Sequence, residues 1–540
     1  MRSEQTDGSR PTYAPRAERL FPWLGAIVGA LMFLPTLWYG FVWDDRYSIV
    51  GNTSLNSWKT LTKGLWGPLN PSVDMYRPIT GSVLFFQFQV FRLHPWGYHL
   101  TSILLHALAC VLVFRVARQL SSTPWAALFA SLLFAVHAAH LEAVAWVSAF
   151  AEPLAVSAIL VGFSAYLHYR QDRQSKWLAI ICLSFFFGLL IKETAVVLPL
   201  LMLAYEFVLG KISLRFLRLN LFLISAIIGL GLLYGAMRHL VYTKILYNES
   251  HLPFSTLFFT WPSLLIAYCK HLLIPTPLSP FYDSDYVQAA NPSFWLPLLG
   301  LLAIAAAVYL ASKRFANGAL VRFCLLAMAI AMIPVLDLNI FQFREIMHDR
   351  FLYLPSVFFA VLLGELLFGS RVDKSSLQIP GRSSAALGAC LLLLNLSALL
   401  IQSPVWRDDI SLHSYAVRIA PHNPRPAFAL ALMYLDRGDL PKADELLQHV
   451  VQLVPAPKAL ALLGQTRLRM GDAKDAEAPL RQAIMAAPDR SGQHLTLAQC
   501  LVLLGRTDEA KAELRAEMAL SPEYREVATQ KLSELLAAKP

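Results

Sequence analysis

The chain has 540 residues, of which 56% are hydrophobic and only 15% are charged, and its mean hydropathy is +0.49. These values exclude an ordinary soluble domain and indicate a membrane protein. The formal net charge of +10 does not favour nucleic-acid binding, because the Lys and Arg residues lie in short clusters between apolar runs, where they orient a membrane protein. The six cysteines form no CxxC motif, so neither a disulfide framework nor a zinc ribbon is expected.

The first apolar run covers residues 20–41 and follows a polar, Arg-containing tail, residues 1–19. It lacks a small-residue cleavage site and is predicted to be an uncleaved transmembrane helix, with the tail on the cytoplasmic side. The run ends in the stretch FVWDDRYSIVGN, which places Asp44 and Asp45 at the edge of the hydrocarbon. Carboxylates are costly at this depth, so we favour a functional role for this acidic pair over simple solvation.

Eleven apolar runs have about the 20-residue length that crosses a bilayer. They lie near residues 20–41, 96–114, 124–140, 153–169, 177–191, 194–210, 219–238, 294–311, 320–336, 351–370 and 383–402. With a cytoplasmic N-terminus, every predicted inner loop contains Arg or Lys, as the positive-inside rule requires. Counting the apolar segment 255–275 as a further span would break this pattern, so it is predicted to be a helix lying at the outer surface.

A repeat follows residue 402, where the sequence becomes polar and rich in Ala and Leu. Three columns recur with a period of 33 or 34 residues: Gly438, Gly471 and Gly505; Ala443, Ala476 and Ala510; and Pro455, Pro488 and Pro522. Gly at a turn between helices, a small Ala inside the helical hairpin and Pro after the second helix are typical of tetratricopeptide repeats. Residues 403–540 are therefore predicted to form an α-solenoid on the non-cytoplasmic side, with a surface for peptides or a partner protein.

Polar residues also gather at the outer ends of the other predicted spans. They include Arg77, His137, His140, Glu142, Lys192, Glu193, Arg344, His348 and Arg350. For Arg77, in MYRPIT, a turn role before Pro78 and a functional role are equally favoured. For Lys192 and Glu193, in IKETA, a simple ion pair at a helical turn is slightly preferred.

The histidines of VHAAHLE, His137 and His140, lie three residues apart and close to Glu142. One helical turn could present both rings to a metal ion, but HExxH is absent and the sequence supplies no third ligand. A hydrogen-bonded pair of interfacial histidines is therefore the favoured interpretation.

The stretch REIMHDRFLYLP places Arg344, His348 and Arg350 at the start of an outer helix, where arginine can hold a phosphate with two N–H groups or contact lipid headgroups. Outward carboxylates beside outward arginines suit the transfer of a sugar from a polyprenyl phosphate. A carboxylate can accept a proton from an acceptor hydroxyl while cations neutralise the phosphate leaving group. Neither a Walker loop nor a GxGxxG-led βαβ unit indicates a nucleotide-sugar site.

These stretches, together with YRPITGSVLFFQFQVFRLHPWGYHLTSILLHALACVLVF, HLLIPTPLSPFYDSDY and the repeats, resemble the transmembrane and tetratricopeptide-repeat O-mannosyltransferases over nearly the whole chain. The resemblance implies an all-α, multi-span type C glycosyltransferase fold, a polyprenyl-phosphate-linked monosaccharide as donor and Ser or Thr as acceptor. It implies that Asp44 and Asp45 are the acidic pair, with Asp44 as the base. Arg77 matches the family's YRP stretch, His140 and Glu142 match its His-x-Glu stretch, and Arg350 is assigned to the donor phosphate on physical grounds.

The chain departs from the eukaryotic members of this family in its short repeat array and in HAAH, where they usually have Pro after the first His. These differences favour a bacterial relative that uses undecaprenyl phosphate in the inner membrane and has a periplasmic active site; in a eukaryote the membrane would be that of the endoplasmic reticulum. No redox cofactor is expected, although a divalent cation, Mg²⁺ or Mn²⁺, could bridge the acidic pair and the phosphate.

Two other classes of function are weighed against the enzyme. In a non-enzymatic scaffold, the spans would anchor an outward repeat unit that recruits envelope partners, and the acidic pair would be dispensable. A transporter should have polar residues near the middle of several spans, but here they cluster at the outer ends, which disfavours transport. The sugar and the nature of the acceptor, protein or glycan, are not determined by the sequence.

Overall fold

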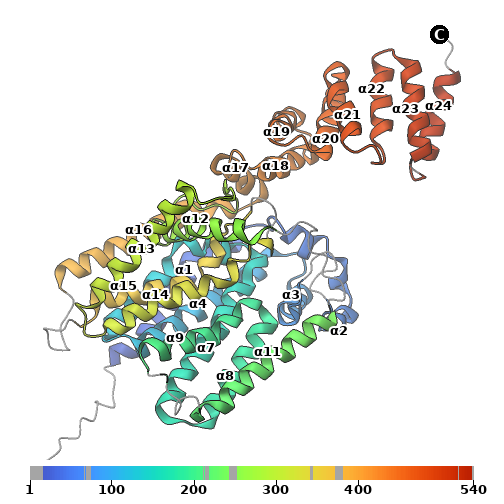
Figure 1. Cartoon of the computed structure of the whole chain (residues 1–540). Helices are drawn as coiled ribbons and strands as arrows, with labels where there is room; N and C mark the ends of the chain where they lie inside the picture. The colour runs from blue at the N-terminus through green and yellow to red at the C-terminus, as the bar shows by residue number, and fades with distance from the viewer. Residues whose placement is uncertain are drawn as a thin grey trace, which may run out of the picture. The chain divides into compact units, whose positions relative to one another are not determined.

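The computed structural model describes residues 16–65, 67, 75–210, 212, 218–241, 252–340, 345–370, 381–520 and 522–537. Regular secondary structure in these residues is helical (Figure 1). The chain divides into two compact units, the first formed by Met1–Pro280 and Ser284–Asp408 and the second by Phe281–Asp283 and Asp409–Pro540. The predicted all-α fold, an apolar multi-helix unit followed by tetratricopeptide helices, is confirmed.

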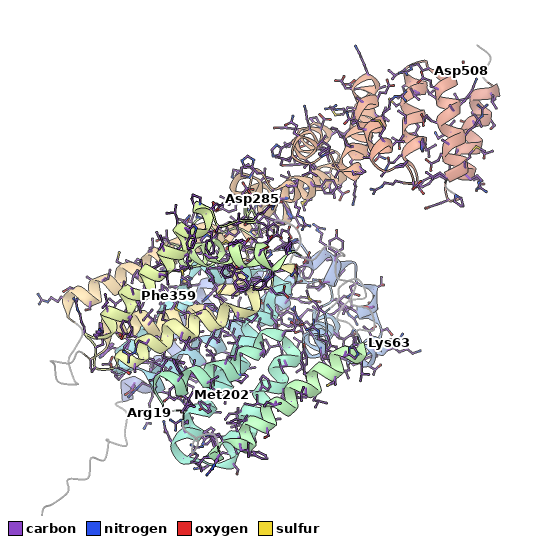
Figure 2. The ribbon with its side chains drawn as sticks, in the orientation of Figure 1. Arg19, Lys63, Met202, Asp285, Phe359 and Asp508 are labelled. Atoms are coloured by element: carbon purple, nitrogen blue, oxygen red, sulfur yellow. The ribbon has the colours of Figure 1, made fainter. Side chains whose placement is uncertain are left out.

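The helices of the first unit follow the predicted apolar runs. They are α1 Phe21–Phe33, α2 Trp58–Leu65, α3 Pro78–Phe91, α4 Pro95–Leu120, α5 Pro124–Val136, α6 Leu141–Ala145, α7 Ala151–Asp172, α8 Ser175–Ile191, α9 Val197–Val208, α11 Leu221–Val241, α12 Phe254–Leu273, α13 Pro292–Ser312, α14 Gly318–Met332, α15 Pro355–Phe368 and α16 Arg382–Gln402. In the view of Figure 2, Arg19, just before α1, and Lys63, in α2, lie on opposite sides of this unit, so the segment that contains α1 runs across it.

Seven helical segments of the described residues are long and apolar enough to cross a membrane, or eight if the pair α5 and α6, bent by 51°, forms one span. Every predicted span contains a helix, but α8, α9 and α15 have only 17, 12 and 14 residues. The prediction of eleven full-length spans is therefore too high by the criterion of helix length. The apolar runs near α9 and α15 include separate 3₁₀ turns, Glu193–Val196 and Asp349–Leu352, which hydropathy does not distinguish from the helix that follows.

The centre of this unit is formed by α4, α5, α7 and α15, whose side chains are mostly buried. Two glycines allow close helix contacts: a Cβ on Gly25 would lie 2.1 Å from Ser131 Oγ, and one on Gly364 would lie 2.4 Å from the Ala126 carbonyl oxygen. Small residues permit such approaches where lipid offers little hydrophobic driving force for helix association. By contrast, α11 and α13 have few buried residues and expose large apolar side chains, as expected for helices that face lipid.

The second unit is built from successive antiparallel helix pairs. Its helices are α17 Asp409–Ile419, α18 Pro424–Asp436, α19 Leu440–Leu453, α20 Pro457–Arg469, α21 Ala473–Ala486, α22 Gln493–Leu503, α23 Thr507–Leu520 and α24 Arg525–Ala537. The predicted turn glycines Gly438, Gly471 and Gly505 have φ of +77°, +87° and +75°, a conformation that disfavours any residue with a Cβ. The repeat prediction is confirmed at each of these turns.

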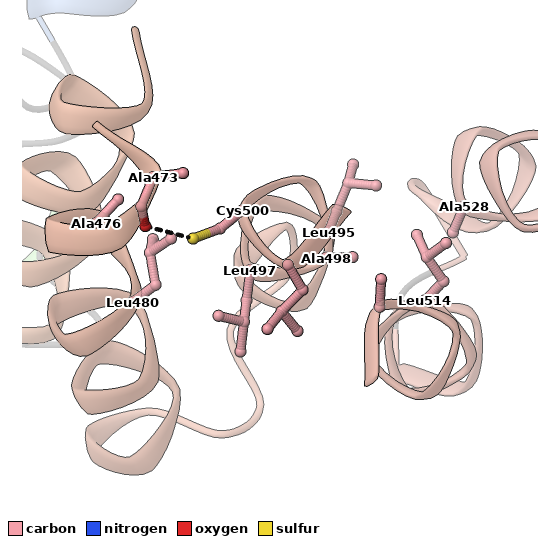
Figure 3. Close-up of a cluster of buried hydrophobic side chains, with 11 residues drawn as sticks. Ala473, Ala476, Leu480, Leu495, Leu497, Ala498, Cys500, Leu514 and Ala528 are labelled. Carbon is pink, nitrogen blue, oxygen red and sulfur yellow. Dashed lines mark hydrogen bonds between the residues drawn. The ribbon is translucent and has the colours of Figure 1, made fainter. Parts of the chain in front are cut away.

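The interior of this unit is formed mainly by alanine and leucine side chains. The predicted alanines Ala443, Ala476 and Ala510 are fully buried. Ala476 belongs to a cluster that joins α21 to α24 (Figure 3), in which the Cys500 thiol donates a hydrogen bond to the Ala473 carbonyl at 3.1 Å. A small residue at this position lets the paired helices approach, which is why the alanine column recurs at the repeat period.

Candidate active site

The acidic pair lies in a tight turn whose two ends, Val42 and Asp45, are hydrogen-bonded to each other. The Asp45 N–H donates to the Val42 carbonyl, and the Val42 N–H donates to Asp45 Oδ2, each at 3.1 Å. Trp43, between them, has a positive φ of 55°, which reverses the chain direction at the end of the first span. The Asp45 side chain is therefore turned back into the protein.

Asp45 is fully buried and held by three donors. Its Oδ1 accepts hydrogen bonds from the Ser148 N–H, at 2.9 Å, and from the Ser148 hydroxyl, while its Oδ2 accepts from Val42. Burial raises the pKa of Asp45 to about 7, although the hydrogen bonds from Ser148 and Val42 act in the opposite direction. Asp45 thus anchors the acidic pair to the segment that precedes α7.

Asp44 has a different environment. Its side chain reaches the protein surface, and among the described residues no group donates a hydrogen bond to its carboxylate. Surrounding protein atoms nevertheless crowd the group and raise its pKa by desolvation, and the positive charge of Arg350 partly opposes this shift. Asp44 is therefore the carboxylate of the pair that is open to a ligand.

Arg350 is fixed by Glu142, which lies 208 residues earlier in the chain. The Arg350 N–H donates to Glu142 Oε2 at 3.1 Å, its guanidinium donates to Glu142 Oε1, and His348 Nδ1 lies 3.6 Å from the same oxygen. The guanidinium also lies over the rings of Trp146, at 5.2 Å, and Phe351, at 4.9 Å. Such two-sided packing restricts the arginine to one direction.

Two further ion pairs complete the charged group. Arg77 donates from Nε and Nη2 to Glu193 Oε2, at 3.0 and 2.9 Å, and Lys192 pairs with Glu152. Burial lowers the pKa of Lys192 well below its usual value, and the charges of Arg77 and Arg350 add to this effect. Burial alone would raise the pKa of Glu193, but the charge and hydrogen bonds of Arg77, with a backbone hydrogen bond and the charge of Lys192, together lower it.

The structure thus brings together most of the predicted site residues. Those that contact or electrostatically influence one another are Asp44, Asp45, Arg77, Glu142, Lys192, Glu193, His348 and Arg350, and we call them, with Glu152, the charged cluster. They come from five separate parts of the chain, and three cations among them are each paired with a glutamate.

The histidines of VHAAHLE lie elsewhere in the interior. His137 Nε2 is bonded to the Leu272 carbonyl, at 3.1 Å, and His140 Nε2 to the Ser356 hydroxyl, at 2.8 Å. Both are almost completely buried, and these partners are not members of the charged cluster. Arg344 lies outside the described residues.

Two participants were not singled out from the sequence, Ser148 and Glu152. Glu152 could have been found because it is an acidic residue near the start of a predicted span, on the same side as Lys192. Ser148 has no such signal, since a serine in an apolar segment commonly bonds only to its own backbone. Its role depends on the distant partner Asp45.

The geometry offers no evident metal site. Among the residues that the structure describes, no group of three or more His, Cys, Asp or Glu side chains is arranged to hold an ion. Both oxygens of Asp45 already accept hydrogen bonds, so the acidic pair presents one open carboxylate rather than two. These residues do not fit a cation bridged by the pair.

The fold and this cluster define a multi-pass membrane protein with a charged site at the ends of its helices and a tetratricopeptide-repeat unit. Residues 78–242 match the family described as dolichyl-phosphate-mannose-protein mannosyltransferase, and residues 424–449 and 467–529 match tetratricopeptide-repeat families.

The similar proteins include several protein O-mannosyl-transferases. Tmtc2 of Drosophila melanogaster is 32% identical over 291 residues, which are 50% of this chain and 27% of that protein. F38B6.6 of Caenorhabditis elegans is 25% identical and TMTC4 of Homo sapiens 27%, with 78% and 74% of this chain aligned to 61% and 62% of theirs. The chain thus spans less than two thirds of the length of each of these relatives, and its predicted resemblance to the O-mannosyltransferases is confirmed.

Among solved structures, ArnT from Cupriavidus metallidurans bound to undecaprenyl phosphate aligns with a TM-score of 0.41 and 15% identity, covering 93% of this chain and 80% of that one. The Archaeoglobus fulgidus oligosaccharyltransferase in its apo form aligns with a TM-score of 0.41 and 12% identity, covering 74% and 57%.

Proposed function

We propose that the chain is a type C membrane glycosyltransferase that transfers mannose, or another hexose, from a polyprenyl-phosphate-linked donor to a Ser or Thr hydroxyl. The observation that carries this proposal is the asymmetry of the acidic pair: Asp45 is held by three hydrogen bonds, whereas Asp44 is exposed and unbonded among the described residues. An anchored but open carboxylate is suited to accept a proton. The match of residues 78–242 supports a dolichyl- or related polyprenyl-phosphate donor.

The reaction assigns Asp44 as the general base. Asp44 takes the proton of the acceptor hydroxyl as the hydroxyl oxygen attacks the anomeric carbon of the sugar. The new C–O bond forms while the bond from the anomeric carbon to the phosphate oxygen breaks, and the polyprenyl phosphate leaves with that electron pair. The raised pKa of Asp44 makes it a stronger base than a free aspartate once it is ionised.

The departing phosphate requires positive charge, which Arg77, Lys192 and Arg350 supply. Each is already oriented by a glutamate, so the phosphate would bind through the N–H groups that these glutamates do not use. Donors fixed before the reaction stabilise developing negative charge without reorganisation. Arg350, whose charge also acts on Asp44, links the phosphate side to the base.

The proposal also specifies the side of the membrane on which transfer occurs and the location of the acceptor. The Arg and Lys residues of the predicted inner loops support a site on the non-cytoplasmic side. The short repeat array and the HAAH stretch support a bacterial inner membrane with a periplasmic acceptor. Residues 403–540 would present the acceptor or a protein partner on that side, as helical-repeat surfaces often do.

The test is transfer of radiolabelled mannose from dolichyl- and undecaprenyl-phosphate mannose to a membrane extract by the reconstituted full-length chain. Asp44→Asn should lower the rate by about 10²- to 10⁴-fold, the contribution of a general base. Asp436→Asn, the same chemical change at an exposed position of the repeat unit, should have no effect. Full activity of Asp44→Asn would refute the assignment, and absence of transfer by the wild-type chain with both donors would favour the scaffold.

A further inference from the structure

A groove of about 420 Å³ lies between α4, α7 and α8, away from the charged cluster. It is lined by the last turns of α4, the last turns of α7 and the first turns of α8, whereas the charged cluster lies beyond the opposite ends of α7 and α8. Trp177, in the groove, and Lys192, in the cluster, are 15 residues apart, which is about 22 Å along a helix. The groove is thus a separate site.

The groove is electropositive. Its lining contains Arg115 and Arg118 and no acidic residue. Arg118 Nε donates to Glu18, at 2.5 Å, so part of its charge is compensated. Arg115 is exposed and has no hydrogen-bond or ion-pair partner among the described residues. An uncompensated arginine beside an apolar surface favours an anion that can use both.

A polar chain crosses the floor of the groove. Gln119 Nε2 donates to the Ser164 hydroxyl at 2.8 Å and to His168 Nε2 at 3.0 Å, and the His168 ring stacks on Trp177 at a centroid distance of 4.6 Å. These bonds use both N–H groups of the amide. Its Oε1 is buried with no hydrogen-bond partner among the described residues, so it is closed to a ligand in the groove.

The remaining lining is apolar and includes Leu112, Val161 and Ile180, which belong to membrane-length or apolar helices. A small soluble anion would leave this apolar surface unused. A choline headgroup carries no net charge with its phosphate. The two features together require an anion and an apolar chain in one ligand.

We infer that this groove binds an anionic phospholipid, with its phosphate at Arg115 and Arg118 and an acyl chain along the apolar lining. This inference does not depend on the proposed transferase activity, because the groove shares no residue with the charged cluster.

The test is native mass spectrometry of the delipidated full-length chain titrated with dioleoyl phosphatidylglycerol or dioleoyl phosphatidylcholine. Phosphatidylglycerol should bind more tightly, and Arg115→Gln should weaken its binding about fivefold, the contribution of one basic residue near anionic lipid. Phosphatidylcholine binding should not change. The matched control is Arg314→Gln, at another exposed arginine of a loop between membrane helices.

A second lipid separates the charge from the glycerol headgroup. Phosphatidic acid, which has the phosphate and chains without the second glycerol, should also bind more tightly than phosphatidylcholine. Equal binding of the choline and glycerol lipids, or an equal loss with Arg314→Gln, would overturn the inference. Complete displacement by millimolar glycerol phosphate or inorganic phosphate would overturn the lipid assignment, since a soluble anion would then suffice. Unchanged melting temperatures would verify that the variants are folded.

Discussion

Replacement of Glu152 by glutamine tests whether the charged cluster is an interdependent array of buried charges. Lys192 and Glu152 have side chains that are only 8% and 7% exposed, and the Lys192 ammonium lies 5.2 Å from the centre of the Phe351 ring. Glu152→Gln would leave the ammonium without this carboxylate, in a place where Arg77 and Arg350 already repel it. Removing one member of a buried pair costs about 3–5 kcal/mol, because the other charge stays desolvated.

This free-energy cost can be converted into a change in melting temperature. A unit of roughly 400 residues has an unfolding entropy of about 0.8 kcal/mol/K, at about 2.1 cal/mol/K per residue. We therefore expect a decrease of about 4–6 °C, measured by thermal unfolding of the full chain in detergent. Glu509→Gln, which disrupts exposed pairs with Arg481 and Arg506, should cost at most about 1 kcal/mol.

The dependence on pH gives a second check. Because the pKa of Lys192 is lowered in the folded chain, the folded state binds fewer protons than the unfolded state between that pKa and 10.5. The contribution of Lys192 to the free energy of unfolding therefore rises with pH between its lowered pKa and 10.5. Loss of the carboxylate paired with this ammonium lowers the Lys192 pKa further, so the deficit of the variant should be no larger at pH 9 than at pH 7. A deficit below about 1 kcal/mol, or one that grows with pH, would refute this reasoning.

Three further outcomes are expected. The rate of sugar transfer should rise with pH as Asp44 ionises, with a midpoint above 3.8 because its pKa is raised, and a pH–rate profile of Asp44→Asn should lack this step. Ser148→Ala removes the hydroxyl donor to Asp45 and should shift its pKa above about 7, measured as a displaced titration of this carboxyl in infrared difference spectra, whereas Ser148→Thr should preserve it. Gly471→Ala should destabilise the repeat unit by about 1–2 kcal/mol through its positive φ, whereas Gly235→Ala, within α11 and with open space around it, should be neutral or slightly stabilising in calorimetry.

The acidic pair shows how adjacent identical residues acquire different roles. Asp44 and Asp45 have the same side chain, adjacent positions in the sequence and the same predicted depth. The turn at Val42 and the distant Ser148 bury one carboxylate and leave the other accessible. An alignment of residue types alone would not distinguish them.

Local patterns in the sequence determined much of the architecture. Hydropathy located the apolar helices because about 20 apolar residues in one run can satisfy their backbone only as a helix in lipid. The repeat glycines, such as Gly471, were found because each turn needs a positive φ at the same step of a 34-residue period. Because successive spans alternate in direction, the sequence also predicted that charged residues from different loops lie at the same, outer ends of the helices.

Tertiary structure alone decided which charges meet. Arg350 pairs with Glu142 across 208 residues and Arg77 with Glu193 across 116, and neither partner can be chosen from spacing. The same applies to His137 and His140, which were predicted to be a hydrogen-bonded pair but whose ring nitrogens bond instead to Leu272 and Ser356. Helix period, turn conformation and hydropathy depend on a few neighbouring residues, whereas the partner of a buried charge depends on which distant segments packing brings within hydrogen-bonding distance.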